Sequence, residues 1–126
     1  MRRPVTSSKF LPPAHIYKLL TPAAWQHSQG QPRLELGADD TSFIHLAESD
    51  QVARIAEKFF KGQSRVIVVE LDPARLPGRL VHEANPGGQT LYYHLYDGYL
   101  PRRAVTGTSI YSLEASTRLR PDSLAR

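Results

Sequence analysis

The pattern of apolar residues predicts one amphipathic helix near the middle of the chain. Between residues 52 and 60, apolar side chains recur three and then one position apart, so that one helical face carries Val52, Ile55, Ala56, Phe59 and Phe60. Ser49 precedes this run as a candidate N-cap, and Gly62 follows it as a stop signal. We expect a second, shorter helix after Thr21-Pro22, because threonine caps helix N-termini and proline suits the first helical turn.

Short apolar or alternating runs elsewhere predict β-strands. The main runs occupy residues 15–20, 42–46, 65–71, 79–83, 90–96 and 104–113, and a shorter one occupies 34–36. Turn residues separate several of them: the segment 85–88 reads NPGG, Asp97-Gly98 follows the tyrosine-rich run, and Gly107 marks a candidate bulge in the last strand. Two helices combined with roughly five or six short strands indicate an α+β domain.

The length and the distribution of charge indicate a single domain between two basic ends. A chain of 126 residues is the size of one domain, and the predicted elements place it at residues 14–116. We interpret residues 1–13 as a flexible lead and residues 117–126 as a flexible basic tail. These ends hold six of the 16 basic residues but one of the 12 acidic ones, so the net charge of +4 belongs to them.

The composition excludes several classes of site. The chain has no cysteine, which rules out disulfides, thiolate zinc sites and cysteine nucleophiles. None of the five histidines pairs with another at a spacing of four on a helix, and we expect no metal. No apolar run approaches the roughly 18 residues of a membrane span, and the basic N-terminus lacks the apolar stretch of a secretory signal. We therefore expect a cytoplasmic protein without membrane contact.

Two histidines within apolar strands are the main candidates for a functional site. His45 lies in FIHL and His94 in LYYHLY, and each is either a hydrogen-bonded core group or a functional imidazole. Strand alternation places Tyr92, His94 and Tyr96 on one face and Tyr93 on the other. Two phenols and an imidazole on one face suit a pocket that stacks an aromatic ring, although the same pattern fits an amphipathic strand with tyrosines at its rim.

Two charged residues in the predicted strands are further candidates. Glu83 ends the RLVHE run just before a loop, a position at which site residues are common. Lys18, in the first predicted strand, is either an anion contact or a surface lysine whose aliphatic stem packs on the protein. No strong sequence motif accompanies them, since the P-loop, GxGxxG, HExxH and GxSxG patterns are all absent.

Four segments, taken in order, resemble a known bacterial-type protein family. They read IYKLLTPAAW, FIHLAESDQV, VIVVELDPARL and HLY, the last followed by LP, and they span Ile16 to Val105. Their order resembles the family called domain of unknown function 952, whose pattern includes a glutamine a few residues after its I-H motif. Gln51 stands where that glutamine is expected.

The resemblance implies a fold and a ligand. The family is similar in layout to the ADP-ribosyltransferase-like fold, which implies a small split or curved, mostly antiparallel β-sheet with two main helices and a cleft that grips NAD. By that likeness, a cofactor-binding cleft for NAD or a related nucleotide would be lined by Tyr17, Lys18, His45, Gln51, Tyr92 and Tyr96.

The same likeness implies a chemistry, which is ADP-ribosyl transfer or cleavage of the NAD glycosidic bond. His45, His94 and Glu83 are the candidate catalytic residues. In this hypothesis the two histidines bind ribose hydroxyls or phosphate, and Glu83 stabilises the positive charge that develops as nicotinamide leaves.

An alternative from another functional class is a non-catalytic binding or regulatory module. Such a module would contact RNA or a protein partner through the basic ends and the tyrosine-bearing strand face. It predicts an affinity that falls steeply with salt, whereas a small ligand in a cleft would bind independently of the basic ends.

Overall fold

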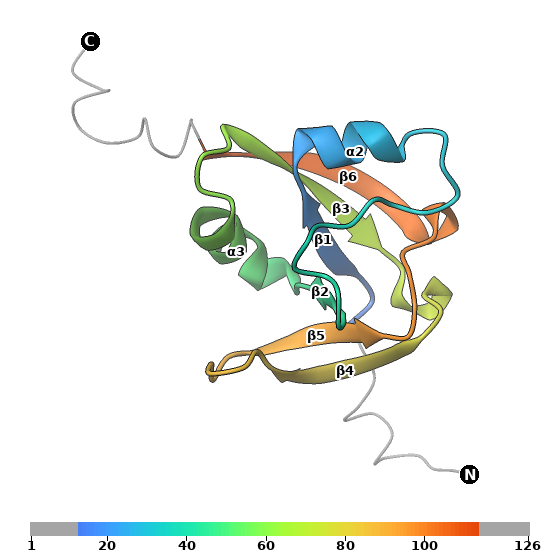
Figure 1. Cartoon of the computed structure of the whole chain (residues 1–126), viewed down its shortest axis with the longest axis vertical. Helices are drawn as coiled ribbons and strands as arrows, with labels where there is room; N and C mark the ends of the chain where they lie inside the picture. Colours follow the sequence, from blue (N-terminus) through green and yellow to red (C-terminus); the bar gives the residue numbers. More distant parts are fainter. Residues whose placement is uncertain (1–12, 114–126) are drawn as a thin grey trace, which may run out of the picture.

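A computed structural model describes residues 13–113 of the chain. The predicted lead at 1–13, apart from Pro13, and the predicted basic tail at 117–126 lie outside the described residues. Two helices and two small antiparallel sheets make up this described part, which is therefore an α+β fold, as the sequence predicts (Figure 1). No helix within residues 13–113 combines the length and apolar character that a membrane crossing needs.

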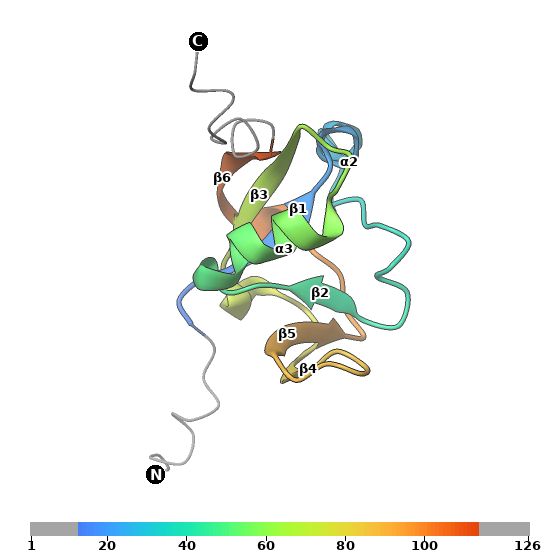
Figure 2. The same cartoon turned by 90° about the vertical axis from the view of Figure 1, so that its left-hand side faces the viewer.

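Each sheet contains three strands. The first sheet has the order β1-β3-β6, with strands Ile16–Leu20, Arg65–Leu71 and Val105–Ser112. The second has the order β2-β5-β4, with strands Ile44–Leu46, Leu91–Tyr96 and Arg79–Ala84. Two backbone hydrogen bonds of 2.8 Å, exchanged between Tyr17 and Ala47, join the edge of β1 to the end of β2. The sheets diverge from this joint, with β4 and β5 lying apart from the first sheet (Figures 1 and 2).

The two helices begin where local chemistry favours it. In α2 (Pro22–Ser28), the Thr21 hydroxyl accepts a hydrogen bond from the Ala24 amide, which confirms the predicted N-cap. The helix α3 (Val52–Phe59) follows a 3₁₀ turn, η1 (Ser49–Gln51). The predicted N-cap at Ser49 is wrong, because the turn already includes that residue and Glu48 occupies the cap position.

The core lies on both faces of the first sheet. β3 is buried from Val66 to Val69, which explains why its sequence is a continuous apolar run rather than an alternating one. On one face, α3 lies across the first sheet (Figure 2), and its Ala56 packs with Leu19, Val66 and Val68. Side chains on the other face form the larger core cluster. This cluster includes buried residues of the second sheet, and partly buried side chains of α2 pack against it.

Two local predictions for the strands have opposite outcomes. The last strand does contain a bulge, next to the predicted position: Gly107 pairs with Glu70 and Val105 pairs with Leu71, so the extra residue in β6 is Thr106. The strand predicted at residues 34–36 is wrong. That segment is an irregular loop, in which Leu34 buries its side chain in the core and donates its amide to the Leu100 carbonyl.

The turn after β5 depends on a glycine at position 98. A Cβ atom there would lie 1.9 Å from the Pro77 carbonyl oxygen, a clash with backbone that no rotamer can relieve. We expect Gly98→Ala to destabilise the protein by about 1–3 kcal/mol or more. Gly37→Ala is the matched control, since a Cβ at Gly37 meets nothing within 4 Å. Urea unfolding of both variants checks the prediction, and equal midpoints would contradict it.

Candidate functional site

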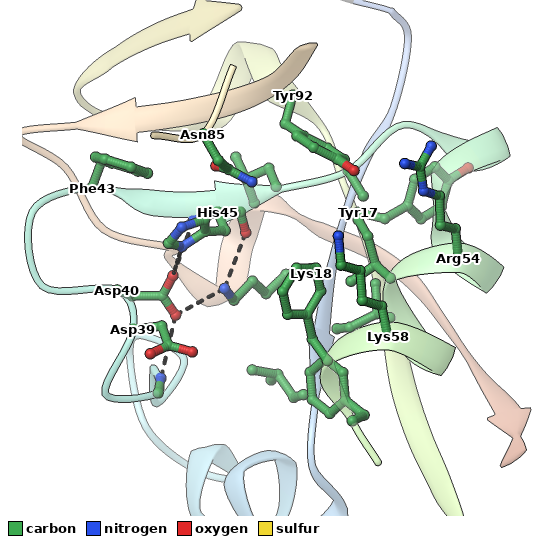
Figure 3. A pocket seen from close by; sticks show the side chains of 18 of the residues that line it. Tyr17, Lys18, Asp39, Asp40, Phe43, His45, Arg54, Lys58, Asn85 and Tyr92 are labelled. Atoms are coloured by element: carbon green, nitrogen blue, oxygen red, sulfur yellow. Dashed lines mark hydrogen bonds and ion pairs between the residues drawn. The ribbon is translucent and has the colours of Figure 1, made fainter. Parts of the chain in front are cut away.

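A large cleft opens beside the joint between the two sheets. It has a volume of about 880 Å³. Its walls come from β1, β2, β5, the helix α3, and the loops at residues 37–43 and 85–90. Figure 3 shows His45 and Asp40 on one side of this space and Arg54 and Lys58 of α3 on the other. Segments distant in the sequence therefore contribute polar groups to one cavity.

A buried ion pair lies at the inner end of the cleft. Lys18 Nζ lies 2.8 Å from Asp40 Oδ2, and the two side chains are 8% and 4% exposed. Lys18 also donates to the backbone carbonyl of His45 at 3.0 Å. Because a buried charge is costly without partners, this arrangement fixes the loop that carries Asp40 against β1 and β2.

Asp40 accepts hydrogen bonds from four donors. Besides Lys18 Nζ, these are His45 Nδ1 at 3.0 Å, the His45 amide at 2.9 Å and the Gly37 amide at 3.3 Å. Burial opposes ionisation of this carboxyl, but the hydrogen bonds from His45 and the charge of Lys18 outweigh it. They hold the pKa of Asp40 well below its usual range, so the group is a carboxylate at neutral pH.

His45 presents its imidazole to the cleft. Its Nδ1 lies against the Asp40 carboxylate, and a carboxylate can only accept, so Nδ1 carries the proton and donates. The side chain is 38% exposed and lines the cavity (Figure 3). No residue within 13–113 forms a hydrogen bond to its Nε2, which is therefore available to a ligand.

His94 lies behind the cleft and is fully buried. Its Nδ1 lies 2.8 Å from Glu83 Oε2, and its Nε2 lies 2.8 Å from Asn85 Oδ1. Phe43 stacks on the ring with centroids 4.0 Å apart. The edge of the His45 ring is also close, at 5.4 Å between centroids. His94 thus supports both the His45 side of the cleft and Asn85, which begins the loop at 85–90.

Glu83 and Tyr96 belong to the same supporting network. The Tyr96 hydroxyl donates to Glu83 Oε2, the oxygen that also accepts from His94. The hydrogen bonds from Tyr96 and His94 hold the pKa of Glu83 below its ordinary value. The hydrogen bond to Glu83 in turn raises the pKa of Tyr96. Both side chains are occupied with one another, and neither lines the cleft.

The residues selected from the sequence therefore separate into two groups. Tyr17, Lys18, His45 and Tyr92 line the cleft. Four others do not line it, namely His94, Glu83, Tyr96 and Gln51. The Gln51 side chain closes the η1 turn by accepting from the Glu48 amide, and it donates to the Leu91 carbonyl at 2.9 Å. The structure thus gives Gln51 a role in anchoring η1 to the start of β5.

Several polar residues of the cleft, among them Asp40, Asn85, Arg54 and Lys58, were not singled out by sequence reasoning. Asp40 and Asn85 lie in loops, where no periodic signal distinguishes a buried side chain from a solvated one. Arg54 and Lys58 are four positions apart on the polar part of α3, a spacing that places both on one side of a helix. That spacing was the one signal in the sequence that pointed toward a cationic wall.

Binding groups for a ligand are present in this cleft, whereas a metal centre is not evident in the described region. Within residues 13–113, no three His, Asp or Glu side chains converge in a way that could hold a metal ion. Besides the paired Lys18, three cations line the cavity, and among the described residues no carboxylate lies within ion-pair distance of Arg54, Lys58 or Lys61. The cleft therefore suits a ligand that carries negative charge.

Comparison with protein families decides the relationship of the chain. The family model described as "Protein of unknown function (DUF952)" matches residues 19–108. The chain belongs to the DUF952 family. This confirms the relationship that the four sequence segments indicate, over nearly the same part of the chain. The matched region contains every helix and strand from α2 to β5 and the first half of β6.

Solved structures extend the comparison of this DUF952 domain. The crystal structure of protein CC0527 from Caulobacter crescentus is 34% identical in sequence and superposes with a TM-score of 0.66, over 80% of this chain and 89% of that one. The solution NMR structure of CC0527 is 33% identical, also with a TM-score of 0.66, over 82% and 89%. A comparison with curated proteins finds no match. The similar structures therefore support the fold and leave the chemistry to be argued from the cleft.

The buried ion pair yields a stability prediction. Lys18→Met should cost about 3–5 kcal/mol, because it leaves the Asp40 carboxylate buried beside an apolar side chain. The double variant Lys18→Met/Asp40→Asn should lose less than the sum of the single changes, since both charges are then absent. Lys58→Met, on an exposed lysine of α3, is the control and should stay within about 0.5 kcal/mol of the wild type. Urea unfolding at neutral pH compares the wild type with Lys18→Met, Asp40→Asn, the double variant and Lys58→Met, and a Lys18→Met variant as stable as the wild type would refute this account.

The network behind the cleft yields a titration prediction. Glu83→Gln should lower the pKa of Tyr96 toward that of an ordinary tyrosine, because it removes the carboxylate that accepts from the phenol and repels the phenolate. Tyr93 is an internal control, since burial is the main cause of its raised pKa. Carbon-13 NMR of the tyrosine rings follows both groups during an alkaline titration. An unchanged Tyr96 titration would show that Glu83 does not hold this hydroxyl in solution.

Proposed function

We propose that the cleft binds NAD or a related phosphate-bearing nucleotide. The observation that carries this proposal is a single cavity with Arg54 and Lys58 of α3 on one side and the imidazole of His45 on the other (Figure 3), where residues 13–113 supply no ion-pair partner to these cations and no hydrogen bond to His45 Nε2. A volume of about 880 Å³ lies within the range of roughly 300–1,000 Å³ that is usual for small-molecule sites. The ligand class follows from the groups that line it.

The cations are suited to the phosphates of such a ligand. Arg54 and Lys58 are exposed at the rim, and their charges can pair with a pyrophosphate without first breaking an ion pair within residues 13–113. Guanidinium and ammonium groups bind phosphate oxygens through charge-assisted hydrogen bonds, which are stronger than neutral ones. Phosphate is therefore expected at the α3 side of the cleft.

The remaining walls suit a ribose and an aromatic ring. Tyr92 and Tyr17 line the cavity and offer ring surface, and His45 and Asn85 offer polar atoms to sugar hydroxyls. The ADP-ribosyltransferase-like layout belongs to the same proposal, because a split pair of antiparallel sheets with a cleft at the split is what that likeness implies. His94, Glu83 and Tyr96 take part in it as the support on which His45 rests.

The binding proposal predicts the effect of removing the cations. The double variant Arg54→Gln/Lys58→Gln should weaken binding of NAD and ADP-ribose about tenfold or more, because each cation supplies a charged contact to phosphate. Arg103→Gln is the matched control, since Arg103 is exposed and does not line the cleft. Calorimetric titration at two salt concentrations gives the affinities.

Amide NMR titrations of the wild-type protein with the same ligands show where they bind. Shifts at residues 17–18, 45 and 92 together with α3 are expected for NAD and ADP-ribose. A short RNA serves as the competing ligand. If RNA alone shifts the spectrum, and its effect disappears at high salt, the proposal fails in favour of a binding module of the kind described above.

A further inference from the structure

We propose that His45 Nε2 is the general base of a hydrolytic reaction in this cleft. In this reaction a water molecule attacks the ribose carbon that is bonded to nicotinamide. The inference rests on the proposed nucleotide binding and goes further, because it assigns a reacting atom and a reaction. The geometry that carries it is the Asp40–His45 pair, with one ring nitrogen held by a buried carboxylate and the other facing the cavity.

The first requirement is the correct tautomer of the imidazole. A base must offer an unprotonated nitrogen at the reacting atom, and the proton must therefore reside on the other ring nitrogen. Asp40 Oδ1 lies 3.0 Å from His45 Nδ1 and can only accept, which places the proton on Nδ1. Nε2 is then the acceptor on the cleft side.

The second requirement is a ring that does not turn away. The same oxygen, Asp40 Oδ1, also accepts from the His45 amide at 2.9 Å, so that the backbone and the ring of one residue are held by one atom. Phe43 and His94 border the ring, with centroids at 4.8 Å and 5.4 Å. The imidazole is therefore confined on the sides that do not face the cleft.

Lys18 and Asp40 are positioning residues in this scheme. Lys18 holds the second carboxylate oxygen of Asp40 and the carbonyl of His45, so it fixes both ends of the Asp40–His45 contact. The hydrogen bonds from His45 and the charge of Lys18 keep Asp40 ionised, and an ionised Asp40 stabilises the imidazolium that forms when His45 takes a proton.

The reaction balances with water as the one co-reactant. The water oxygen forms a bond to the anomeric carbon of the ribose, and its proton passes to His45 Nε2. The electron pair of the breaking carbon–nitrogen bond goes to the pyridinium nitrogen, so nicotinamide leaves as a neutral molecule. ADP-ribose is the other product, and the imidazolium then returns its proton to solvent.

Charged groups of both signs line the cleft with His45, namely Asp39, Asp40, Lys18, Arg54, Lys58 and Lys61. A general base must be unprotonated to accept the proton of water, so the rate should fall as the pH is lowered. His94 borders the ring, but both of its nitrogens are already occupied by Glu83 and Asn85.

The first test is the tautomer itself, in the wild-type protein. Long-range proton–nitrogen NMR of the ring should show His45 protonated at Nδ1 and unprotonated at Nε2 near neutral pH. Asp40→Asn should change this signature, because an amide can donate to Nδ1 and stabilise the other tautomer. A wild-type ring protonated at Nε2 alone would overturn the inference without any variant being made.

The second test separates catalysis from binding. His45→Gln should lower the rate of nicotinamide release at saturating NAD by about 100-fold or more, a loss that weaker binding cannot explain because the site is filled. His27→Gln is the matched control, because His27 is exposed on α2 and does not line the cleft. The acid decline of the rate should be present in the wild type and His27→Gln and absent from the residual activity of His45→Gln.

The outcomes distinguish the two proposals. Wild-type protein that binds NAD but releases no nicotinamide above the protein-free control overturns the general base and leaves the nucleotide site intact. A His45→Gln variant that releases nicotinamide as fast as the wild type also overturns the general base and leaves the nucleotide site intact. Wild-type protein that does not bind NAD or ADP-ribose at all refutes the proposed function, and with it this inference.

Discussion

The buried contact between Lys18 and Asp40 is the constraint on which the site depends. An ammonium and a carboxylate that are both nearly inaccessible to water must satisfy one another, and here they do so at 2.8 Å. The remaining hydrogen-bonding capacity of the pair is directed to His45, at its amide, its ring and its carbonyl. One electrostatic requirement thus fixes a strand, a loop and the imidazole that faces the cleft.

A second polar network supports the first from behind. His94 is fully buried, yet both ring nitrogens have partners, as buried polar groups require. Phe43 lies between the two systems, in contact with the rings of both histidines. Two imidazoles on paired positions of β2 and β5 therefore have different environments, one enclosed by protein and one facing a cavity.

The helices and main strands could be predicted because burial imposes a period on the sequence. The apolar residues of α3 recur at helical spacing, and β3 is continuous because it is covered on both faces. The site could be predicted in part, since alternation assigned Tyr92, His94 and Tyr96 to one strand face. Alternation does not show which side chain packs against a strand face, so the stacking of Phe43 on His94 could not be predicted. The role of Asp40 could not be predicted either, because its partner Lys18 lies 22 positions away and the loop that carries Asp40 has no periodic pattern.

The joint between Tyr17 and Ala47 has a mechanical consequence for the cleft. The helix α3 packs on β1 and β3, so one wall of the cavity belongs to the first sheet, whereas His45 belongs to the second. Each sheet keeps its own ladder of hydrogen bonds, and a pair of backbone bonds links β1 to β2. A rotation about this joint would separate side chains of the two sheets that share the larger core cluster, so that cluster resists any change in the width of the cavity. Lys18 adds to this resistance at the cavity itself, because it reaches from β1 to the loop that carries Asp40 and to the His45 carbonyl of β2.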